Sequence, residues 1–253
     1  MPGHSAECSA RTSRAAPLRR RLGLSMSVQE QVVARDGRHA VIVCHPDPDS
    51  FDHAIAARYC DEVRAVGQTV VLRDLYAMHF DPVLKAEERP TLAAPVRSPD
   101  VTAEHQILAG CDVFVLIYPI WFGSPPAMMK GYVERVFGAG VSPEDVRRQA
   151  RGDLLGDKRL LSFTTSAMSG PWLAREGQEL GLSAVFDDYI VHAFGMRSRE
   201  HKRFALITDE MGEHSAATYL WEVAQQAHRT CAQVAFGDEA LMHDPRLARQ
   251  FSR

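Results

Sequence analysis

The sequence predicts an α/β fold: a doubly wound parallel β-sheet with helices on both faces. Residues 40–44 and 113–118 are short apolar runs, typical of strands that are buried on both sides. Residues 53–66 follow the first run and carry apolar side chains at the spacing of one helix face. Strands that alternate with helices form parallel sheets, and right-handed crossovers make such sheets doubly wound.

Five strands and their connecting helices can be assigned along the chain. Gly67 suits the C-terminal end of the helix at 53–66, because glycine readily adopts the left-handed conformation that ends many helices. Pro125 and Pro126 suit the start of a helix at 126–137, where a missing N–H costs least. The other expected elements, in chain order, are a strand at 69–72, a long loop at 77–99, a helix at 100–110, a loop at 138–157, a strand at 159–165, a fifth strand within 185–194 and a final helix at 212–235.

Composition divides the chain into three parts. Residues 1–37 are poor in apolar side chains and carry five arginines against one acidic residue before position 30, so we expect a disordered basic extension. This segment lacks the apolar core of a secretory signal, and the alternative interpretation is an organelle transit peptide. Residues 38–236 form the expected globular domain, and residues 237–253 form the expected C-terminal tail.

Charge and cysteine content restrict the partners. The formal net charge of −3 gives no reason to expect nucleic acid or an anionic membrane as the main partner. No apolar stretch approaches the roughly 18 residues that a membrane span requires. The five cysteines form no C-x-x-C pair and are odd in number, which favours buried free thiols in a reducing compartment. We therefore expect a cytoplasmic protein.

Three loops directly follow expected strands and are the candidate site. In doubly wound sheets, ligands bind beyond the carboxyl ends of the strands, where the strand order reverses. The loops cover residues 45–52, 119–126 and 164–172.

The first loop leads into a helix N-terminus, which offers unpaired N–H groups and a positive dipole end to a phosphate. Ser50 can add its hydroxyl. The alternative is an ordinary helix cap, because Ser and Asp both cap well. Asp47, Asp49 and Asp52 count against phosphate, since like charges repel an anion.

The second and third loops differ in chemistry. Trp121 and Phe122 stand together on a strand-to-helix turn, where they suit the wall of a site for a flat ligand such as isoalloxazine. The alternative is a hydrophobic corner that buries Trp121. The third loop, Thr164 to Trp172, is rich in small polar residues whose N–H groups could stabilise charge on a reduced flavin, or it is an ordinary Ser/Thr loop. No spacing of Cys and His suggests a metal site.

Three stretches together resemble the NAD(P)H:quinone oxidoreductase family, the flavodoxin-like group that includes DT-diaphorase. Residues 45–54 resemble its His-x-x-x-x-Ser-Phe-Asn phosphate loop. Residues 74–82, Asp-Leu-Tyr-Ala-Met-His-Phe-Asp-Pro, resemble its Asp-Leu-Tyr-x-Met-x-Phe-x-Pro stretch. Residues 119–137 resemble its flavin-ring loop and the helix after it. The three stretches occur in the family's order.

The resemblance implies a flavodoxin-like fold and a bound FAD, with FMN as the alternative. It implies hydride transfer from NAD(P)H to quinone-type acceptors, and a homodimer with flavin sites at its interface. We expect ping-pong kinetics with two-electron transfer, because both substrates would need the same open face of the ring. The residues placed at the flavin by this resemblance are His45, Ser50, Phe51 and Asp52 at the phosphates, Pro119, Ile120, Trp121, Phe122 and Gly123 at the ring, and Thr164, Thr165, Ser166 and Ala167 at its N1/O2 edge.

The chain departs from the family at several positions. Asp52 stands where the family often has Asn, and Ser166 and Ala167 replace two glycines. Trp172 and Gln178 fall near a Tyr and a catalytic His of the mammalian enzymes. We therefore assign no catalytic side chain, since the flavin carries the chemistry.

Two other functions fit the same fold. One is a regulatory subunit of a potassium efflux system, and the other is a flavodoxin-type electron carrier. A carrier would be shorter and strongly acidic around its flavin, whereas this chain is nearly neutral and has extra loops at 77–99 and 138–157.

Overall fold

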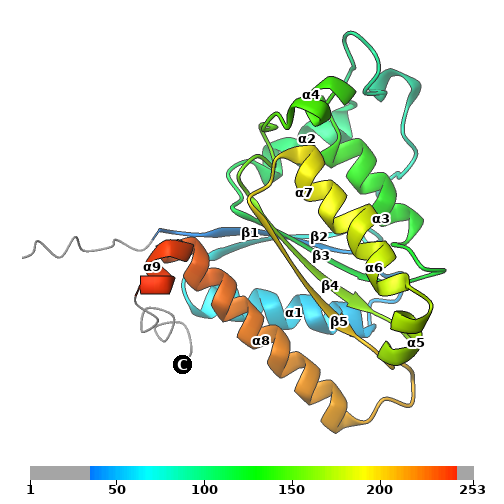
Figure 1. Ribbon diagram of the computed structural model, residues 1–253, viewed down its shortest axis with the longest axis vertical. Coiled ribbons are helices and arrows are strands. Elements are labelled where there is room, and N and C mark those ends of the chain that lie inside the picture. The colour runs from blue at the N-terminus through cyan, green and yellow to red at the C-terminus, as the bar shows by residue number, and fades with distance from the viewer. Residues whose placement is uncertain (1–34, 244–253) are drawn as a thin grey trace, which may run out of the picture. The chain divides into compact units, whose positions relative to one another are not determined.

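A five-stranded, wholly parallel sheet forms the centre of the fold (Figure 1). The computed structural model describes residues 35–243, so most of the expected basic extension and the last ten residues lie outside the described part. The strand order is β2-β1-β3-β4-β5, which is the flavodoxin-like order and confirms the predicted doubly wound sheet. The strands are β1 (Arg38–Val43), β2 (Thr69–Asp74), β3 (Val113–Pro119), β4 (Arg159–Thr165) and β5 (Ser198–Phe204).

Helices cover both faces of the sheet (Figure 1). On one face, α1 (Phe51–Ala65) packs beside the long α8 (Glu213–Phe236). The helical elements that contribute to the core on the other face are α2 (Pro99–Leu108), α3 (Ala127–Tyr132), its π-helical continuation η3 (Val133–Phe137), α6 (Gln178–Leu182), a second π-helical segment η4 (Ser183–Asp188) and α7 (Tyr189–Phe194). None of the helices in residues 35–243 is long and apolar enough to cross a membrane.

Strand β3 shows why the central strands read as continuous apolar runs. All seven of its residues are buried. Val115 and Ile117 face the core beneath α1 and α8, whereas Leu116 and Tyr118 face the core on the other side. A strand buried on both faces needs apolar side chains at every position, which removes the alternation of a half-exposed strand.

The fifth strand was predicted at the wrong place. Residues 185–194 are helical, within η4 and α7, and the strand lies at Ser198–Phe204. Phe186, Ile190 and Phe194 are buried at helical spacing, while Val185 is exposed. The true β5 is an edge strand of mostly polar residues that pairs only with β4, so it lacks the apolar run by which buried strands are recognised.

Smaller differences concern the ends and the loops. The expected loop at 138–157 contains a short helix α4 (Pro143–Arg148), which begins with a capping box between Ser142 and Asp145. The segment after residue 236 contains α9 (Asp238–His243), and Asp238 forms an ion pair with Arg159. The remaining short helices are the 3-10 turn η2 (Ala86–Glu88) and α5 (Gly170–Arg175).

The long loop at 77–99 is held by one buried cation. Arg135 in η3 is 1% exposed and donates to both carboxylate oxygens of Glu88, at 2.9 and 2.8 Å. It also donates to Asp100 and to the backbone oxygen of Asp81. This guanidinium lowers the pKa of Glu88 to about 2. Arg135 therefore anchors the loop at Asp81 and Glu88.

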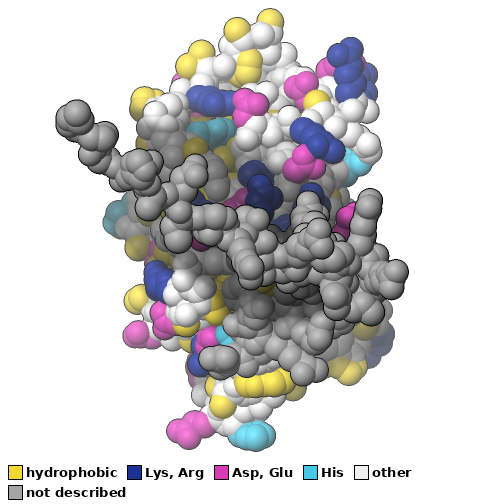
Figure 2. All heavy atoms as spheres, turned by 90° about the vertical axis from the view of Figure 1, so that its left-hand side faces the viewer, with side chains coloured by type: hydrophobic (Ala, Val, Ile, Leu, Met, Phe, Trp, Pro, Cys, Tyr) yellow, Lys and Arg dark blue, Asp and Glu magenta, His cyan; other side chains and the backbone are white. Residues whose placement is uncertain are grey.

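The visible surface carries charges of both signs. On the face shown in Figure 2, basic and acidic side chains of the described residues alternate over short distances. This interspersed pattern accords with the nearly balanced net charge of −3.

Candidate functional site

The three predicted loops meet at one cavity of about 460 Å³. They follow β1, β3 and β4, and the cavity lies at the carboxyl ends of these strands. Because β1 and β3 flank the reversal in strand order, this is the switch point at which such folds bind ligands. The lining residues are His45, Asp47, Asp49, Ser50, Phe51, Asp52, Ala54, Pro119, Ile120, Trp121, Thr165, Ser166, Ala167, Ile207, Thr208, Asp209 and Met211.

The N-terminus of α1 forms one side of the cavity. Ser50 is the N-cap, and its hydroxyl accepts from the N–H of His53 at 3.4 Å. The same hydroxyl is 2.9 Å from Nδ1 of His53, whose Nε2 is 2.9 Å from Asp74. The helix-cap interpretation of Ser50 is therefore correct, and it leaves the positive end of the 15-residue helix at the cavity.

Nδ1 of His45 lies 3.1 Å from the N–H of Asp47 and 3.3 Å from its backbone oxygen. The shorter contact has Nδ1 as acceptor, and in that neutral tautomer Nε2 carries the ring proton and can donate to a ligand. Burial lowers the pKa of His45 and favours this neutral form. The ring of Phe51 turns instead toward the core, against Phe204 and Tyr219.

Asp52 is the most unusual group in the cavity. Its side chain is buried, with the residue only 2% exposed, and it accepts from Thr165 Oγ1 at 2.9 and 3.2 Å. Burial raises the pKa of Asp52 to about 7, although the hydrogen bond from Thr165 and the nearby His53 act in the opposite direction. The sequence argument treated Asp52 as a permanent anion. In the fold, burial instead moves the protonation of this carboxyl toward neutral pH.

The second loop contains a tight reverse turn. Trp121 and Ser124 exchange two backbone hydrogen bonds, at 3.0 and 3.1 Å. Phe122 and Gly123 occupy the two central positions with φ of 51° and 79°. Two positive values are what a type I′ turn requires, and such a φ is uncommon for a residue with a side chain. The structure therefore stores backbone strain at this loop.

The turn separates its two aromatic side chains. Trp121 lines the cavity, is 39% exposed and lies 5.8 Å from the ring of His45. It is therefore not buried in a hydrophobic corner. Phe122 is fully exposed and does not line the cavity, and neither does Gly123. A Cβ on Gly123 would lie 3.7 Å from Gln178, so Gln178 stands beside the turn.

The side chains of the third loop lie on both faces of the sheet. Thr165, Ser166 and Ala167 line the cavity, as predicted by position. The side chain of Thr164 is buried elsewhere, with its hydroxyl 2.8 Å from Nε2 of His201. His201 also bonds Asp187 through Nδ1. Thr164 therefore supports the loop through a buried polar cluster.

Sequence reasoning missed the contribution that follows β5. Ile207, Thr208, Asp209 and Met211 line the cavity. They were missed because the fifth strand was placed too early, which hid the loop at its carboxyl end. Correct placement of that strand would have found them by the same rule that found the other three loops.

The cavity is acidic but suits a flat, phosphorylated ligand. Among the described residues that line it, four are aspartates and none is Lys or Arg. Anion binding must therefore rest mainly on the N–H groups and dipole of the α1 N-terminus, with Ser50 and His45 beside them. Pro119, Ile120 and Trp121 supply an apolar wall, and the volume is within the usual range for cofactor sites. These features fit a flavin.

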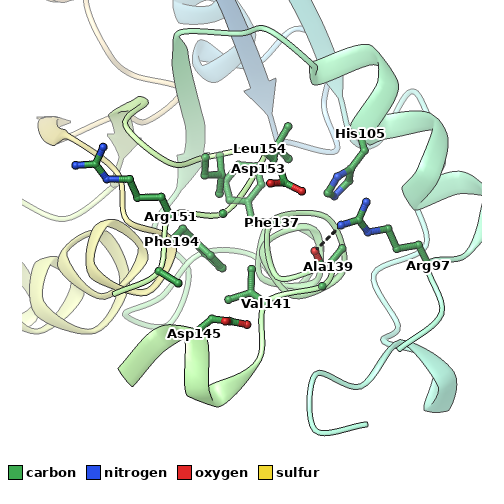
Figure 3. A pocket seen from close by; sticks show the side chains of 14 residues that line it. Arg97, His105, Phe137, Ala139, Val141, Asp145, Arg151, Asp153, Leu154 and Phe194 are labelled. Atoms are coloured by element: carbon green, nitrogen blue, oxygen red, sulfur yellow. Dashed lines mark hydrogen bonds between the residues drawn. The ribbon is translucent and has the colours of Figure 1, made fainter. Parts of the chain in front are cut away.

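A second cavity lies away from the three loops. It has a volume of about 190 Å³ and is lined from α2, the loop after η3 and the loop before β4 (Figure 3). Arg97 reaches across it to the backbone oxygen of Ala139, and His105 lies nearby, bonded to the backbone oxygen of Val136 (Figure 3). No group of three or more potential metal ligands occurs within residues 35–243.

Comparisons with known proteins agree with this geometry. The model of a family described by the flavodoxin-like fold matches residues 38–229. A Haemophilus influenzae protein named an uncharacterized NAD(P)H oxidoreductase is 34% identical over 128 residues, covering 50% of this chain and 63% of its own length. The rat NAD(P)H dehydrogenase [quinone] 1 is 28% identical over 157 residues, covering 55% and 57%. The chain thus spans less than two thirds of either relative.

Solved structures show the same architecture. An NAD(P)H:quinone oxidoreductase from Methanothermobacter marburgensis superposes with a TM-score of 0.66 at 19% identity, covering 76% of this chain and 96% of that one. A Klebsiella pneumoniae protein named a putative quinone reductase gives a TM-score of 0.62 at 23% identity, covering 76% of this chain and 83% of that one. At these identities the likeness establishes the fold alone. With the family match over residues 38–229, it shows that this chain belongs to the family with the flavodoxin-like fold.

Proposed function

We propose that this chain binds a flavin at the cavity and uses it to oxidise NAD(P)H and reduce quinone-type acceptors. The observation that carries the proposal is the convergence of three loops, selected from sequence alone, on one cavity at the switch point. The relatives named as NAD(P)H oxidoreductases support the reaction class.

Each side of the cavity has a role in this proposal. The α1 N-terminus would hold the phosphate through its positive dipole and N–H groups, with Ser50 and His45 beside it. Ile120 and Trp121 would pack along the ring system. Within the described residues, the backbone N–H groups of Phe122, Gly123 and Ala167 donate to no other group of the chain, so they can serve the polar edges of a ligand.

A bound flavin would supply hydride transfer, and the protein would supply position and electrostatics. The strained turn at Phe122 and Gly123 holds its backbone donors in one orientation. The hydrogen bond from Thr165 to Asp52 joins the phosphate loop to the loop after β4, which keeps the two sides of the cavity at a set separation. We propose FAD as the flavin, with FMN as the alternative.

The direct test is an absorbance spectrum of the purified protein, followed by mass spectrometry of the released cofactor. We expect a yellow protein with about one flavin per chain. NAD(P)H oxidation with menadione then tests the reaction. A colourless protein that neither FAD nor FMN can reconstitute would refute the proposal.

The two other functions make different predictions in the same assays. An electron carrier would bind flavin but would not oxidise NAD(P)H with menadione. A regulatory subunit would co-purify with membrane transport components. The acidity of the cavity is the one observation that favours a carrier.

We also propose a homodimer. The apolar side chains of Met129, Tyr132 and Phe137 are buried within the chain, so the segment 126–137 does not offer them to a partner. Val185 is 74% and Tyr189 57% exposed beside a groove of about 400 Å³ with a mainly apolar lining. An apolar surface of this kind is typical of protein interfaces.

A further inference from the structure

Asp52 poses an electrostatic problem for the proposed flavin site. Its carboxyl lines the same cavity as Ser50 and the first turn of α1, where the phosphate is expected. Burial leaves the residue 2% exposed, so water screens the carboxyl poorly. Within residues 35–243, no Lys or Arg lines the cavity to offset its charge. An ionised Asp52 and a phosphate would therefore repel each other across a poorly screened site.

The surrounding groups do not remove this conflict. The first loop contributes His45 and the carboxylates of Asp47 and Asp49, and the loop after β5 adds Asp209. Two further titratable groups act on Asp52 from its own helix and from the end of β1. His53 lowers the pKa of Asp52, but it is also hydrogen-bonded to Asp74 at the end of β2, and Cys44 has its own pKa raised to about 12. The thiol is therefore neutral at physiological pH.

Hydrogen bonding gives a second reason for a proton on Asp52. A phosphate oxygen and an ionised carboxylate are both acceptors, so neither can donate to the other. A protonated carboxyl has one donor. Thr165 Oγ1 lies 2.9 Å from Oδ2 and 3.2 Å from Oδ1, so the acid can keep the shorter contact on Oδ2 and donate to the phosphate from Oδ1. The neutral acid then offers one donor and one acceptor, as an amide side chain in the same place would.

Building on the proposed flavin site, we propose that Asp52 binds the flavin phosphate in its protonated form, as a hydrogen-bond donor, so that flavin binding takes up one proton from solvent above neutral pH. The proton moves from solvent to one carboxylate oxygen of Asp52, which would then donate to the phosphate. Flavin affinity thereby becomes pH-dependent, because Asp52 titrates whereas the Asn that the family often has at this position does not.

The size of the effect follows from the pKa of about 7 in the free protein. Above that value, the fraction of protein carrying the proton falls tenfold for each pH unit. The dissociation constant of the flavin should therefore rise roughly 15-fold between pH 7.0 and 8.5. Replacement by Asn supplies a donor that does not titrate, so the same interval should change its affinity by less than about twofold.

The test is a fluorescence titration of flavin-free protein with FAD and, separately, FMN at pH 7.0, 7.5, 8.0 and 8.5. Above pH 7 a phosphate monoester is largely dianionic, so its own titration contributes little. The variant is Asp52→Asn. The matched control is Asp49→Asn, which removes an exposed carboxylate from the same loop. Calorimetry at pH 8 in two buffers of different protonation enthalpy counts the protons taken up.

We expect the wild type and Asp49→Asn to share the steep pH dependence and to take up close to one proton per flavin. Asp52→Asn should bind about tenfold more tightly than wild type at pH 8 and take up almost none. Equal slopes in wild type and Asp52→Asn, or weaker binding by the variant at every pH, would overturn the inference while leaving the flavin site intact. Absence of flavin binding in all three folded proteins would refute the site itself.

Discussion

Buried His39 should make the flavin-free protein less stable as the pH falls below 7. Its ring is fully buried at the start of β1, 2.9 Å from the hydroxyl of Tyr59 and 2.8 Å from Oε1 of Gln68. The amide of Gln68 donates to the backbone oxygen of Cys231, so its Oε1 is left to accept from the ring. The ring proton then lies on Nε2, and Nδ1 accepts from Tyr59. This arrangement suits a neutral imidazole.

Burial lowers the pKa of His39 from 6.5 to about 4, although the hydrogen bond with Gln68 acts in the opposite direction. A depressed folded-state pKa means that the unfolded chain binds the proton more tightly. The stability contribution is therefore complete above about pH 6.5 and is lost as the pH falls toward 4. Between pH 7 and 5, the loss is about 2 kcal/mol in the free energy of unfolding.

The measurement is urea unfolding of wild type and His39→Asn at pH 7 and pH 5. Asp52 acts in the opposite direction, because its raised pKa contributes stability below about pH 4 that is lost as the pH rises through 7. That effect is common to both proteins and cancels in their difference. The stability gap between wild type and His39→Asn should narrow by about 2 kcal/mol at pH 5. A gap that stays the same at both pH values would show that His39 does not resist protonation.

Four further predictions concern other parts of the molecule. Replacing Arg135 with Met should lower the free energy of unfolding by about 3–5 kcal/mol, because Glu88 is left as a buried charge without its partner. Chemical denaturation measures this change, and a decrease below about 1 kcal/mol would contradict the prediction. Val185→Glu should yield a monomer by light scattering, whereas Met242→Glu, at an equally exposed apolar residue, should not; a wild-type monomer at micromolar concentration would refute the dimer. Trp121→Ala should weaken flavin retention, measured as flavin content after gel filtration, and full retention would show that the ring does not pack there. Steady-state rates with NAD(P)H and menadione should give parallel double-reciprocal lines, because each substrate must place a reacting atom within about 3–3.5 Å of the same open face of the flavin ring. Intersecting lines would contradict this ping-pong mechanism.

The alternation of strands and helices could be predicted because it depends on the local spacing of apolar residues. The run at 113–118 is apolar at every position, and the segment at 159–165 matches β4 at both ends. The rule that ligands bind at strand carboxyl ends then selected the loops without any coordinates. The edge strand Ser198–Phe204 was not predicted, because its polar side chains show no such pattern. The strand depends on pairing with β4, and a short stretch of sequence does not show which segment pairs with it.

The sequence by itself determined the fold class, the positions of the first four strands and the three loops of the candidate site, since apolar spacing and chain connectivity act over short distances. Only the tertiary structure decided how those loops work. It brought Thr165 to Asp52 across 113 residues, turned Thr164 toward His201 and left Phe122 in solvent. It also decided the protonation of Asp52. A pKa depends on burial and on neighbours drawn from the whole chain, and those exist only once the chain has folded.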